Sequence, residues 1–194
     1  MKLIVGLGNP EQRYEGTRHN AGFAALESLA GNLSAAWQDK TRFKALIAET
    51  NAGSEKLLLA KPTTFYNNSG EAVRSIANFY NIEAQNILIV HDDIDLPFGT
   101  ICTRIGSSPA GNNGLRSINQ HVGNDTCRVR IGTWNELNDK IDTSDFVLSK
   151  FSKDEQSIFE KDIVPTALHY IDTFLNGTFA PTKYSVMKRS EIDS

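Results

Sequence analysis

Residues 87–95 read Ile-Leu-Ile-Val-His-Asp-Asp-Ile-Asp, and this stretch says most about the fold. Its first part, residues 87–90, is apolar throughout, which is typical of a strand buried on both faces of a sheet. The part that follows, residues 91–95, is acidic. In α/β proteins, binding and catalytic side chains gather at the carboxyl ends of such strands. The ends of the expected strands are therefore the places to look for a site.

Similar apolar runs recur along the chain and alternate with helical patterns. The other expected strands are residues 3–7, 43–49, 57–60, 100–105 and 127–131. Apolar residues at helical spacing predict helices at residues 21–30, 69–80, 114–122 and about 154–175. Pro165 should kink or divide the last helix, and Asn176 and Gly177 should end it. This alternation predicts an α/β layer fold with a largely buried sheet.

The bulk properties place limits on the class of protein. The chain has 194 residues, which fits one domain with a real core. The net charge of −3 argues mildly against a dedicated nucleic-acid binder but leaves room for a local basic groove. Both cysteines, Cys102 and Cys127, lie in apolar runs, so buried free thiols are expected rather than a disulfide framework.

The ends of the chain carry two further expectations. The first residues lead straight into a strand rather than a signal peptide, and no apolar run is long enough for a membrane span. A cytoplasmic location follows by default. We expect the catalytic domain to occupy residues 1–177 and the polar residues 178–194 to form a poorly ordered tail.

The first strand ends in Gly6-Leu7-Gly8-Asn9-Pro10, which begins like a dinucleotide-binding glycine loop. The motif fails because Glu11 stands at the third glycine position and Pro10 stands where a helix should be forming. A tight turn is the plain interpretation. A sharper hypothesis is that the turn aims the Asn9 amide, which both donates and accepts hydrogen bonds, into a cleft.

A second strand end leads into Phe65, Tyr66 and Asn67. A loop followed by a helix N-cap explains Asn68 and Ser69, and residues 68–71 fit a capping box. That interpretation does not require Asn67. The two aromatic residues belong either to the core or to an apolar wall beside the Asn67 amide.

Two other strand ends allow opposing interpretations. The acids of residues 91–95 could hold a hard divalent cation or could simply be solvated, and Asp92 is the best placed to point inward. The small residues of 106–114 precede a helix, so their backbone N–H groups suit a phosphate or a developing oxyanion. An ordinary flexible loop has the same composition.

His19 stands directly before Asn20, which we expect to cap the helix that follows. The positive end of that helix disfavours an imidazolium, as a general base requires. Asp92 can orient the ring from its other nitrogen. No serine or cysteine stands at a nucleophile elbow, so water is the expected nucleophile.

The same residues carry a family resemblance. In order and spacing, six segments resemble those of the bacterial peptidyl-tRNA hydrolases: VGLGNP (5–10), TRHNAGF (17–23), KPTTFYNNSG (61–70), HDDIDLPFG (91–99), GNNGLRSI (111–118) and RVRIG (128–132). The similarity runs from residue 3 to about residue 151.

The resemblance implies one α/β domain, with a mixed twisted sheet flanked by α-helices on both faces. It implies a metal-free, cofactor-free and monomeric esterase that cleaves the ester between a peptide and the tRNA 3′ ribose. His19 would activate water and Asp92 would orient His19. The implied substrate-binding residues are Asn9, Tyr14, Phe65, Tyr66, Asn67 and Asn113.

For the tRNA partner, the resemblance implies Arg104, Asn112, Arg130 and Lys140. Arg116 and Arg128 are further local candidates, because phosphates are bound by Arg and Lys. An ordinary solvated charge on a helix face or strand edge explains each of them equally well. The acidic total predicts modest, salt-sensitive affinity. No membrane contact and no obligate protein partner are expected.

The chain departs from the family pattern at Glu11, Tyr66, Asn112, Thr133 and Trp134. The family usually has glycine, methionine, histidine, isoleucine and glycine at these places. The departures leave the implied chemical residues untouched but affect the cleft and the tRNA side. Two alternatives stay open: a relative that binds RNA or protein with little hydrolysis, and a metal-dependent hydrolase built on residues 91–95.

Overall fold

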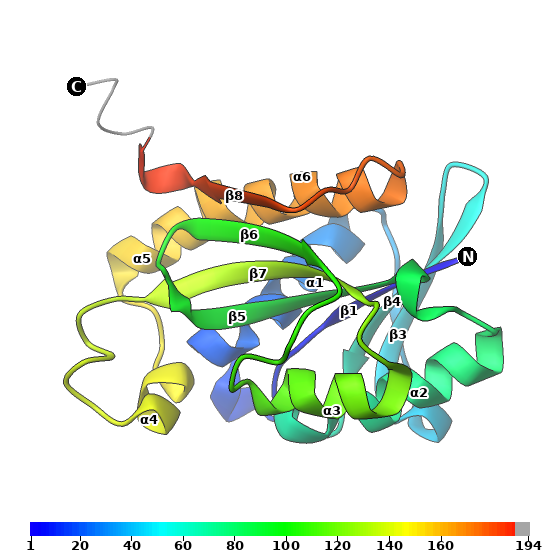
Figure 1. The fold of residues 1–194 in the computed structure, drawn as a ribbon, viewed down its shortest axis with the longest axis horizontal. Coiled ribbons are helices and arrows are strands. Elements are labelled where there is room, and N and C mark those ends of the chain that lie inside the picture. The colour runs from blue at the N-terminus through cyan, green and yellow to red at the C-terminus, as the bar shows by residue number, and fades with distance from the viewer. Residues whose placement is uncertain (189–194) are drawn as a thin grey trace.

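One sheet runs through the whole molecule (Figure 1). The structure, a computed structural model, describes residues 1–188. The strands are β1 Lys2–Gly6, β2 Trp37–Lys40, β3 Ala45–Ala52, β4 Glu55–Pro62, β5 Ile87–Pro97, β6 Thr100–Ile105, β7 Cys127–Trp134 and β8 Thr182–Ser185. Their order in the sheet is β2-β3-β4-β1-β5-β7-β6-β8.

The centre of the sheet is parallel and its margins are antiparallel. Strands β4, β1, β5 and β7 run in one direction. At the margins, β3 and β2 on one side and β6 and β8 on the other each run antiparallel to the preceding strand of the sheet. The expected mixed sheet is thus confirmed. All four parallel strands end at one edge, so the residues after them lie close together.

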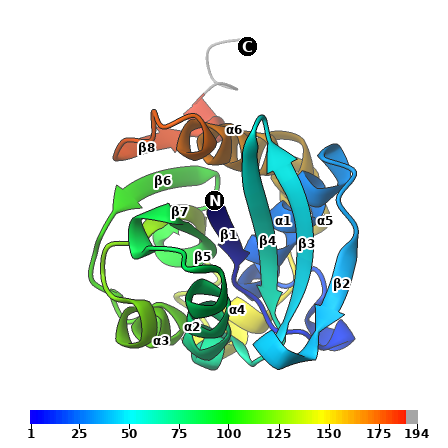
Figure 2. The same cartoon turned by 90° about the vertical axis from the view of Figure 1, so that its right-hand side faces the viewer.

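Helices cover both faces of the sheet, as predicted (Figure 2). The helices are α1 Ala21–Asn32, α2 Ser69–Tyr80, α3 Asn113–Val122, α4 Thr143–Leu148, α5 Lys153–Ile158 and α6 Val164–Leu175. Apolar residues of α1 and α6 pack on one face of the sheet, and those of α2 and α3 pack on the other.

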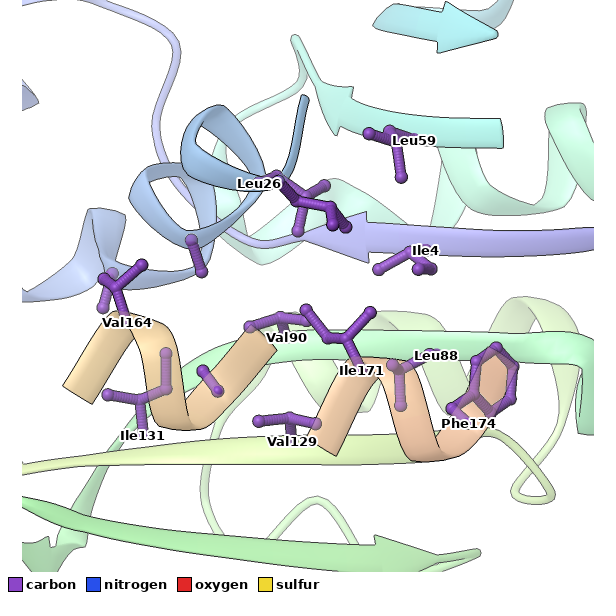
Figure 3. Packing of buried hydrophobic residues seen from close by; sticks show 14 of the residues in the cluster. Ile4, Leu26, Leu59, Leu88, Val90, Val129, Ile131, Val164, Ile171 and Phe174 are labelled. Atoms are coloured by element: carbon purple, nitrogen blue, oxygen red, sulfur yellow. The ribbon is translucent and has the colours of Figure 1, made fainter. Parts of the chain in front are cut away.

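Alternating side chains of the central strands supply the two cores. Ile4 and Val90 contact the layer of α1 and α6, where Leu26 and Ile171 meet them (Figure 3). Their neighbours in the strands, such as Val5, face α2 and α3 instead. Each fully buried side chain of this size contributes roughly 1.5–3 kcal/mol of hydrophobic stabilisation. The near-continuous apolar runs noted in the sequence therefore serve two cores at once.

Strand β5 extends beyond the four apolar residues that predict it. It pairs with β7 through His91↔Arg130, Asp92↔Ile131 and Asp93↔Gly132 before the register shifts. Asp92 therefore lies within a strand rather than in a loop after one. The backbone hydrogen bonds to β7 keep this polar part of β5 extended, although its side chains give no strand signal.

Two marginal strands were missed. The strand β2 is polar and pairs only with β3. The strand β8 falls in the segment where a poorly ordered polar tail is expected, yet it pairs with β6 along Thr100↔Ser185 to Thr103↔Thr182 (Figure 1). The expectation was wrong for residues 182–188, which form β8 and a short 3₁₀ turn. The rest of the predicted tail, residues 189–194, lies outside the described part of the chain.

The last helical region is divided as predicted. A π-helical turn, Phe159–Ile163, separates α5 from α6, and Pro165 stands in the first turn of α6, where its missing N–H costs nothing. Asn176 caps the end of α6, and Gly177 follows with a φ of 76°. The predicted helix end is confirmed.

Two predicted N-terminal caps were wrong. Asn68 makes no side-chain hydrogen bond to α2, and Glu71 pairs with Lys44 instead of reaching back. Asn20 makes no cap bond to α1 either. In both places a 3₁₀ turn leads directly into the helix, and in α2 the Gly70 N–H donates to Ser117 Oγ at 3.1 Å rather than to Asn68.

Two glycines let α1 touch the sheet. A Cβ on Gly22 would lie 2.3 Å from the Val90 carbonyl oxygen and 2.7 Å from the Leu7 nitrogen. A Cβ on Gly6 would lie 2.5 Å from the Gly22 carbonyl oxygen. This backbone contact sets the start of α1 against the ends of β1 and β5. It thereby fixes the turn that carries His19.

The remaining expectations from composition concern the cysteines and the membrane. Cys102 and Cys127 are both buried and free, as predicted. Within residues 1–188, no helix is long and apolar enough to cross a membrane.

Candidate active site

A cleft of about 810 Å³ opens at the edge where the parallel strands end. It is bordered by the segments after β1 and β4, by β5, by the loop before α3 and by α4. Of the residues predicted for the site, its lining includes Asn9, His19, Phe65, Tyr66, Asn67, Asp92, Arg104, Asn112, Asn113 and Arg130. Segments far apart in the sequence thus meet in one place.

His19 and Asp92 form a close pair in this cleft. The Nδ1 atom of His19 lies 3.0 Å and 2.9 Å from the two carboxylate oxygens of Asp92. The Asp92 side chain is 2% exposed and that of His19 is 16% exposed. With Nδ1 held by the carboxylate, Nε2 is the ring nitrogen left to act on a molecule in the cleft. This is the geometry expected of an oriented general base.

Tyr66 completes the surroundings of the pair. Its ring stacks on the His19 imidazole, with centroids 3.5 Å apart and planes 12° apart. Its hydroxyl donates to Asp92 Oδ1 at 2.7 Å. Burial raises the pKa of Asp92, but the charge and hydrogen bonds of His19 and the Tyr66 hydroxyl outweigh it, so that pKa lies below its usual value. Asp92 is therefore a carboxylate at neutral pH.

Asn9 is held by the Asn20 side chain and by the backbone N–H of Tyr66. Its N–H donates to Asn20 Oδ1 at 2.8 Å, and its carbonyl oxygen accepts from Asn20 Nδ2 at 3.0 Å. The Asn9 Oδ1 atom accepts the Tyr66 N–H at 2.9 Å. The amide orientation is fixed, so its Nδ2 donor is the part left for a ligand. Asn20 thus positions Asn9, a role that sequence reasoning missed.

Three further predicted residues line the mouth of the cleft. Asn67 and Asn113 are exposed, and Phe65 is 53% exposed. Asn67 belongs to the 3₁₀ turn before α2, whereas Asn113 is the first residue of α3. Phe65 is therefore part of the wall and not of the core.

Asn112 is committed to contacts within the protein. Its Oδ1 accepts the Leu115 N–H at 3.0 Å and caps α3, while its Nδ2 donates to the Tyr66 hydroxyl at 3.1 Å. Of the five departures from the family pattern, Tyr66 and Asn112 line the cleft and touch each other. Glu11, Thr133 and Trp134 do not line it.

The cationic candidates fall into three groups. Arg104 and Arg130 line the cleft, and Arg130 Nε donates to Asp93 at 2.7 Å. Arg128 also borders the cleft but is 1% exposed. Arg116, exposed on α3, and Lys140, exposed in the turn before α4, lie outside the lining. Tyr14, although predicted with the substrate-binding residues, lies outside the lining too and packs under the Arg13 guanidinium.

Arg128 shapes the cleft rather than offering a free charge. Its guanidinium donates to Ser107 Oγ and Ser108 O at 2.8 Å, to Ser107 O at 2.7 Å and to Asn119 Oδ1 at 2.8 Å. These bonds hold the loop before α3. Its interpretation as a surface cation was wrong, because the strand that carries it is covered.

The acids of residues 91–95 are engaged with protein donors. Asp92 contacts His19 and Tyr66, and Asp93 pairs with Arg130. His91 is fully buried, and its Nδ1 lies 2.7 Å from the Asp92 carbonyl oxygen. No group of three or more His, Cys, Asp or Glu side chains is placed to hold a metal ion in the part of the chain that the structure describes.

Sequence reasoning missed Arg18 and α4. Arg18 is 1% exposed, pairs with Glu155 at 2.8 Å and lies between the rings of Phe146 and Phe151. It joins the His19 turn to α4, whose residues 143, 144, 147 and 148 line the cleft. Burial raises the pKa of Glu155, but Arg18 and other donors bring it below its usual value. The only signal in the sequence was the charge beside His19.

The fold and the cleft define an α/β protein whose histidine–carboxylate pair faces an open cleft at the carboxyl edge of a parallel sheet, as in enzymes that activate water. The chain belongs to the peptidyl-tRNA hydrolase family, whose model matches residues 3–192. Membership favours the hydrolase over the binding-only alternative.

Individual relatives agree over most of their length. The peptidyl-tRNA hydrolase of Aliarcobacter butzleri is 44% identical over 172 residues, which cover 89% of this chain and 91% of that protein. That of Finegoldia magna is 46% identical over 164 residues, or 84% of this chain and 85% of its own. The crystal structure of peptidyl-tRNA hydrolase from Acinetobacter baumannii superposes with a TM-score of 0.83 at 34% identity, covering 91% and 89% of the two chains.

Proposed function

We propose that this chain hydrolyses the ester between a peptide and the 3′ ribose of tRNA, with His19 as general base for water. The observation that carries the proposal is the His19–Asp92 pair in an open cleft, with Nδ1 bound at 2.9 Å and Nε2 left for water. An acyl ester has a reasonable leaving group. A positioned base offers about 10²–10⁴-fold, and oxyanion donors add a comparable factor.

Amide side chains suit the peptide part of this substrate. Asn9, Asn67 and Asn113 offer donors and acceptors that match main-chain groups whatever the peptide sequence. The start of α3, at Asn113, borders the cleft and adds the partial positive charge of a helix N-terminus to the donors of these amides. We assign the carbonyl oxygen of the ester to these donors. Phe65 supplies an apolar surface at the entrance.

Arginine side chains suit the tRNA part. Arg104 and Arg130 line the same cleft as His19, so phosphates near the 3′ end can approach them while the ester lies at the base. Lys140, exposed in the turn that leads to α4, could contact only tRNA that extends beyond the cleft. We also propose that the protein acts as a monomer in the cytoplasm, where translation supplies this substrate.

The experiment measures release of free tRNA from an N-acetyl-aminoacyl-tRNA in excess chelator. We expect the wild type to be active, His19→Ala to lose about 10²–10⁴-fold in turnover while still binding tRNA, and Asp92→Asn to lose less. His169→Ala, which removes an exposed histidine of α6, is the matched control and should stay active. Near-normal turnover by His19→Ala would refute the assignment. A wild type that binds tRNA without releasing it would instead indicate a binding protein.

A further inference from the structure

Tyr66 occupies an unusually constrained place in the cleft. One face of its ring lies on the His19 imidazole at 3.5 Å. The ring also lies against the start of α3, since a Cβ on Gly114 would be 2.5 Å from Tyr66 Cε1. The side chain is 2% exposed. Such a residue offers little surface to a substrate, although it stands among residues expected to bind one.

The hydrogen bonds of the Tyr66 hydroxyl have a defined direction. The Leu115 N–H binds Asn112 Oδ1, so the other amide atom, Nδ2, faces the hydroxyl and can only donate. The hydroxyl proton is then free to go to Asp92 Oδ1, at 2.7 Å. Burial and the charge of Asp92 raise the pKa of Tyr66 well above its usual value, so the proton stays on the oxygen. A directed chain runs from Asn112 through Tyr66 to Asp92 and His19.

We infer that Tyr66 and Asn112 are positioning residues for the His19–Asp92 pair: the tyrosine ring fixes the imidazole plane, and its hydroxyl, held by Asn112, fixes the carboxylate. The inference rests on the proposed function of His19. It also gives Tyr66 and Asn112 tasks other than binding peptide and tRNA.

The contact to Asp92 has a consequence for the pH profile. The Tyr66 hydroxyl draws negative charge from the carboxylate that faces His19. The other charged or titratable groups around the pair are His91, Asp93 and the Arg130 that binds Asp93. Without the hydroxyl, the Asp92 carboxylate would present more of its negative charge to the base. The acid limb of the pH–rate profile should therefore move to higher pH.

The test is a double-mutant cycle of Tyr66→Phe and Asn112→Ser. Phenylalanine keeps the stacked ring and removes only the hydroxyl, while serine keeps an N-cap acceptor for α3 and removes the amide donor. We expect Tyr66→Phe to lower kcat about tenfold with KM within about twofold, and to raise the acid midpoint by about 0.5 pH unit. Asn112→Ser alone should lower kcat about threefold.

The double variant shows whether Asn112 acts through the Tyr66 hydroxyl or has a separate effect on kcat. Because Asn112 acts through the hydroxyl, adding Asn112→Ser to Tyr66→Phe should change kcat by less than about twofold. Tyr80→Phe is the matched control, because it removes another tyrosine hydroxyl next to a carboxylate, Glu49, at 3.3 Å and outside the cleft. It should match the wild type.

Three results would overturn the inference: an unchanged acid midpoint in Tyr66→Phe, a kcat within twofold of wild type, or losses that multiply in the double variant. The proposed function is judged separately. If His19→Ala is inactive and Tyr66→Phe behaves as wild type, only the positioning role fails. If His19→Ala is active, the proposed function fails with it.

Discussion

The contact of Gly22 with the sheet gives the sharpest prediction about how the fold holds the site. In Gly22→Ala, the new methyl group would meet the Val90 carbonyl oxygen at 2.3 Å and the Leu7 N and O atoms at 2.7 Å. Ordinary contact begins at 3.4 Å, so the Val90 contact alone requires a movement of 3.4 − 2.3 = 1.1 Å. All three atoms are backbone atoms, and no side-chain rotation can relieve the overlap.

The movement would act directly on the pair formed by His19 and Asp92, to which we assign the chemistry. Gly22 lies in the first turn of α1, three residues after His19 of the preceding 3₁₀ turn. Val90 lies two residues before Asp92 in β5. The 2.9 Å bond between His19 Nδ1 and Asp92 would lengthen beyond hydrogen-bond range if the start of α1 retreated by that amount. We expect a loss of about 1–3 kcal/mol in the free energy of unfolding. Misplacement by about 1 Å should also cost about 10²-fold in turnover.

The assay combines urea unfolding with single-turnover tRNA release, measured where the variant is fully folded. Gly31→Ala, in the same helix, is the matched control, because its Cβ would meet no atom within 4 Å. It should be neutral or more stable by up to about 1 kcal/mol, with full activity. A Gly22→Ala protein with the stability and turnover of the wild type would refute the argument. So would equal effects of the two substitutions.

Three further predictions concern pH, salt and α4. Burial lowers the pKa of His91 in the folded protein, although the charge of Asp93 opposes this, so the unfolded chain takes up the proton at higher pH than the folded one. The free energy of unfolding should therefore fall as the pH drops below about 6.5, by at most about 1.4 kcal/mol per pH unit. His91→Gln should flatten that slope in urea titrations at pH 7.5 and 5.5. Arg104→Ala should weaken tRNA binding and reduce the slope of log Kd against log salt by about 1, whereas exposed Lys161→Ala should not; an unchanged slope argues against a phosphate contact. Arg18→Met should cost about 1–3 kcal/mol, because Glu155 loses its counter-charge and keeps only the Asn135 and Ser152 donors, and it should expose α4 to protease. A wild-type digestion pattern would contradict the role of Arg18 in holding α4.

The roles of several polar residues depended on what covers them. Arg128 looks like any surface arginine in the sequence, but the loop of Ser107 folds over it and accepts its hydrogen bonds. Arg18 likewise lies between two aromatic rings and binds Glu155, which is 137 residues away in the chain. No local pattern reports such a partner. From its residue type alone, an arginine is expected to be exposed. Whether it is buried instead depends on long-range packing.

The polar strands could not be predicted from the sequence for a related reason. The strand β8 has no apolar alternation to mark it, and it forms because the edge of β6 offers unpaired backbone groups. The polar half of β5 is a strand because β7 pairs with it beyond Val90. Hydrogen bonding to a neighbour can impose extended structure on residues that carry no strand signal of their own.

The sequence alone was enough to predict the α/β class, the buried central strands and a break in the last helical region near Pro165, and to propose His19 and Asp92 as the chemical pair. These follow from periodicity, chain-breaking residues and the order of motifs, which are local properties. The stacking of Tyr66 on His19 and the bond from Asn112 to the Tyr66 hydroxyl become visible in the folded protein alone, because those contacts join residues 46 positions or more apart. Contacts of this kind depend on how helices and strands pack, and side chains acquire them only when the sheet brings its strand ends together.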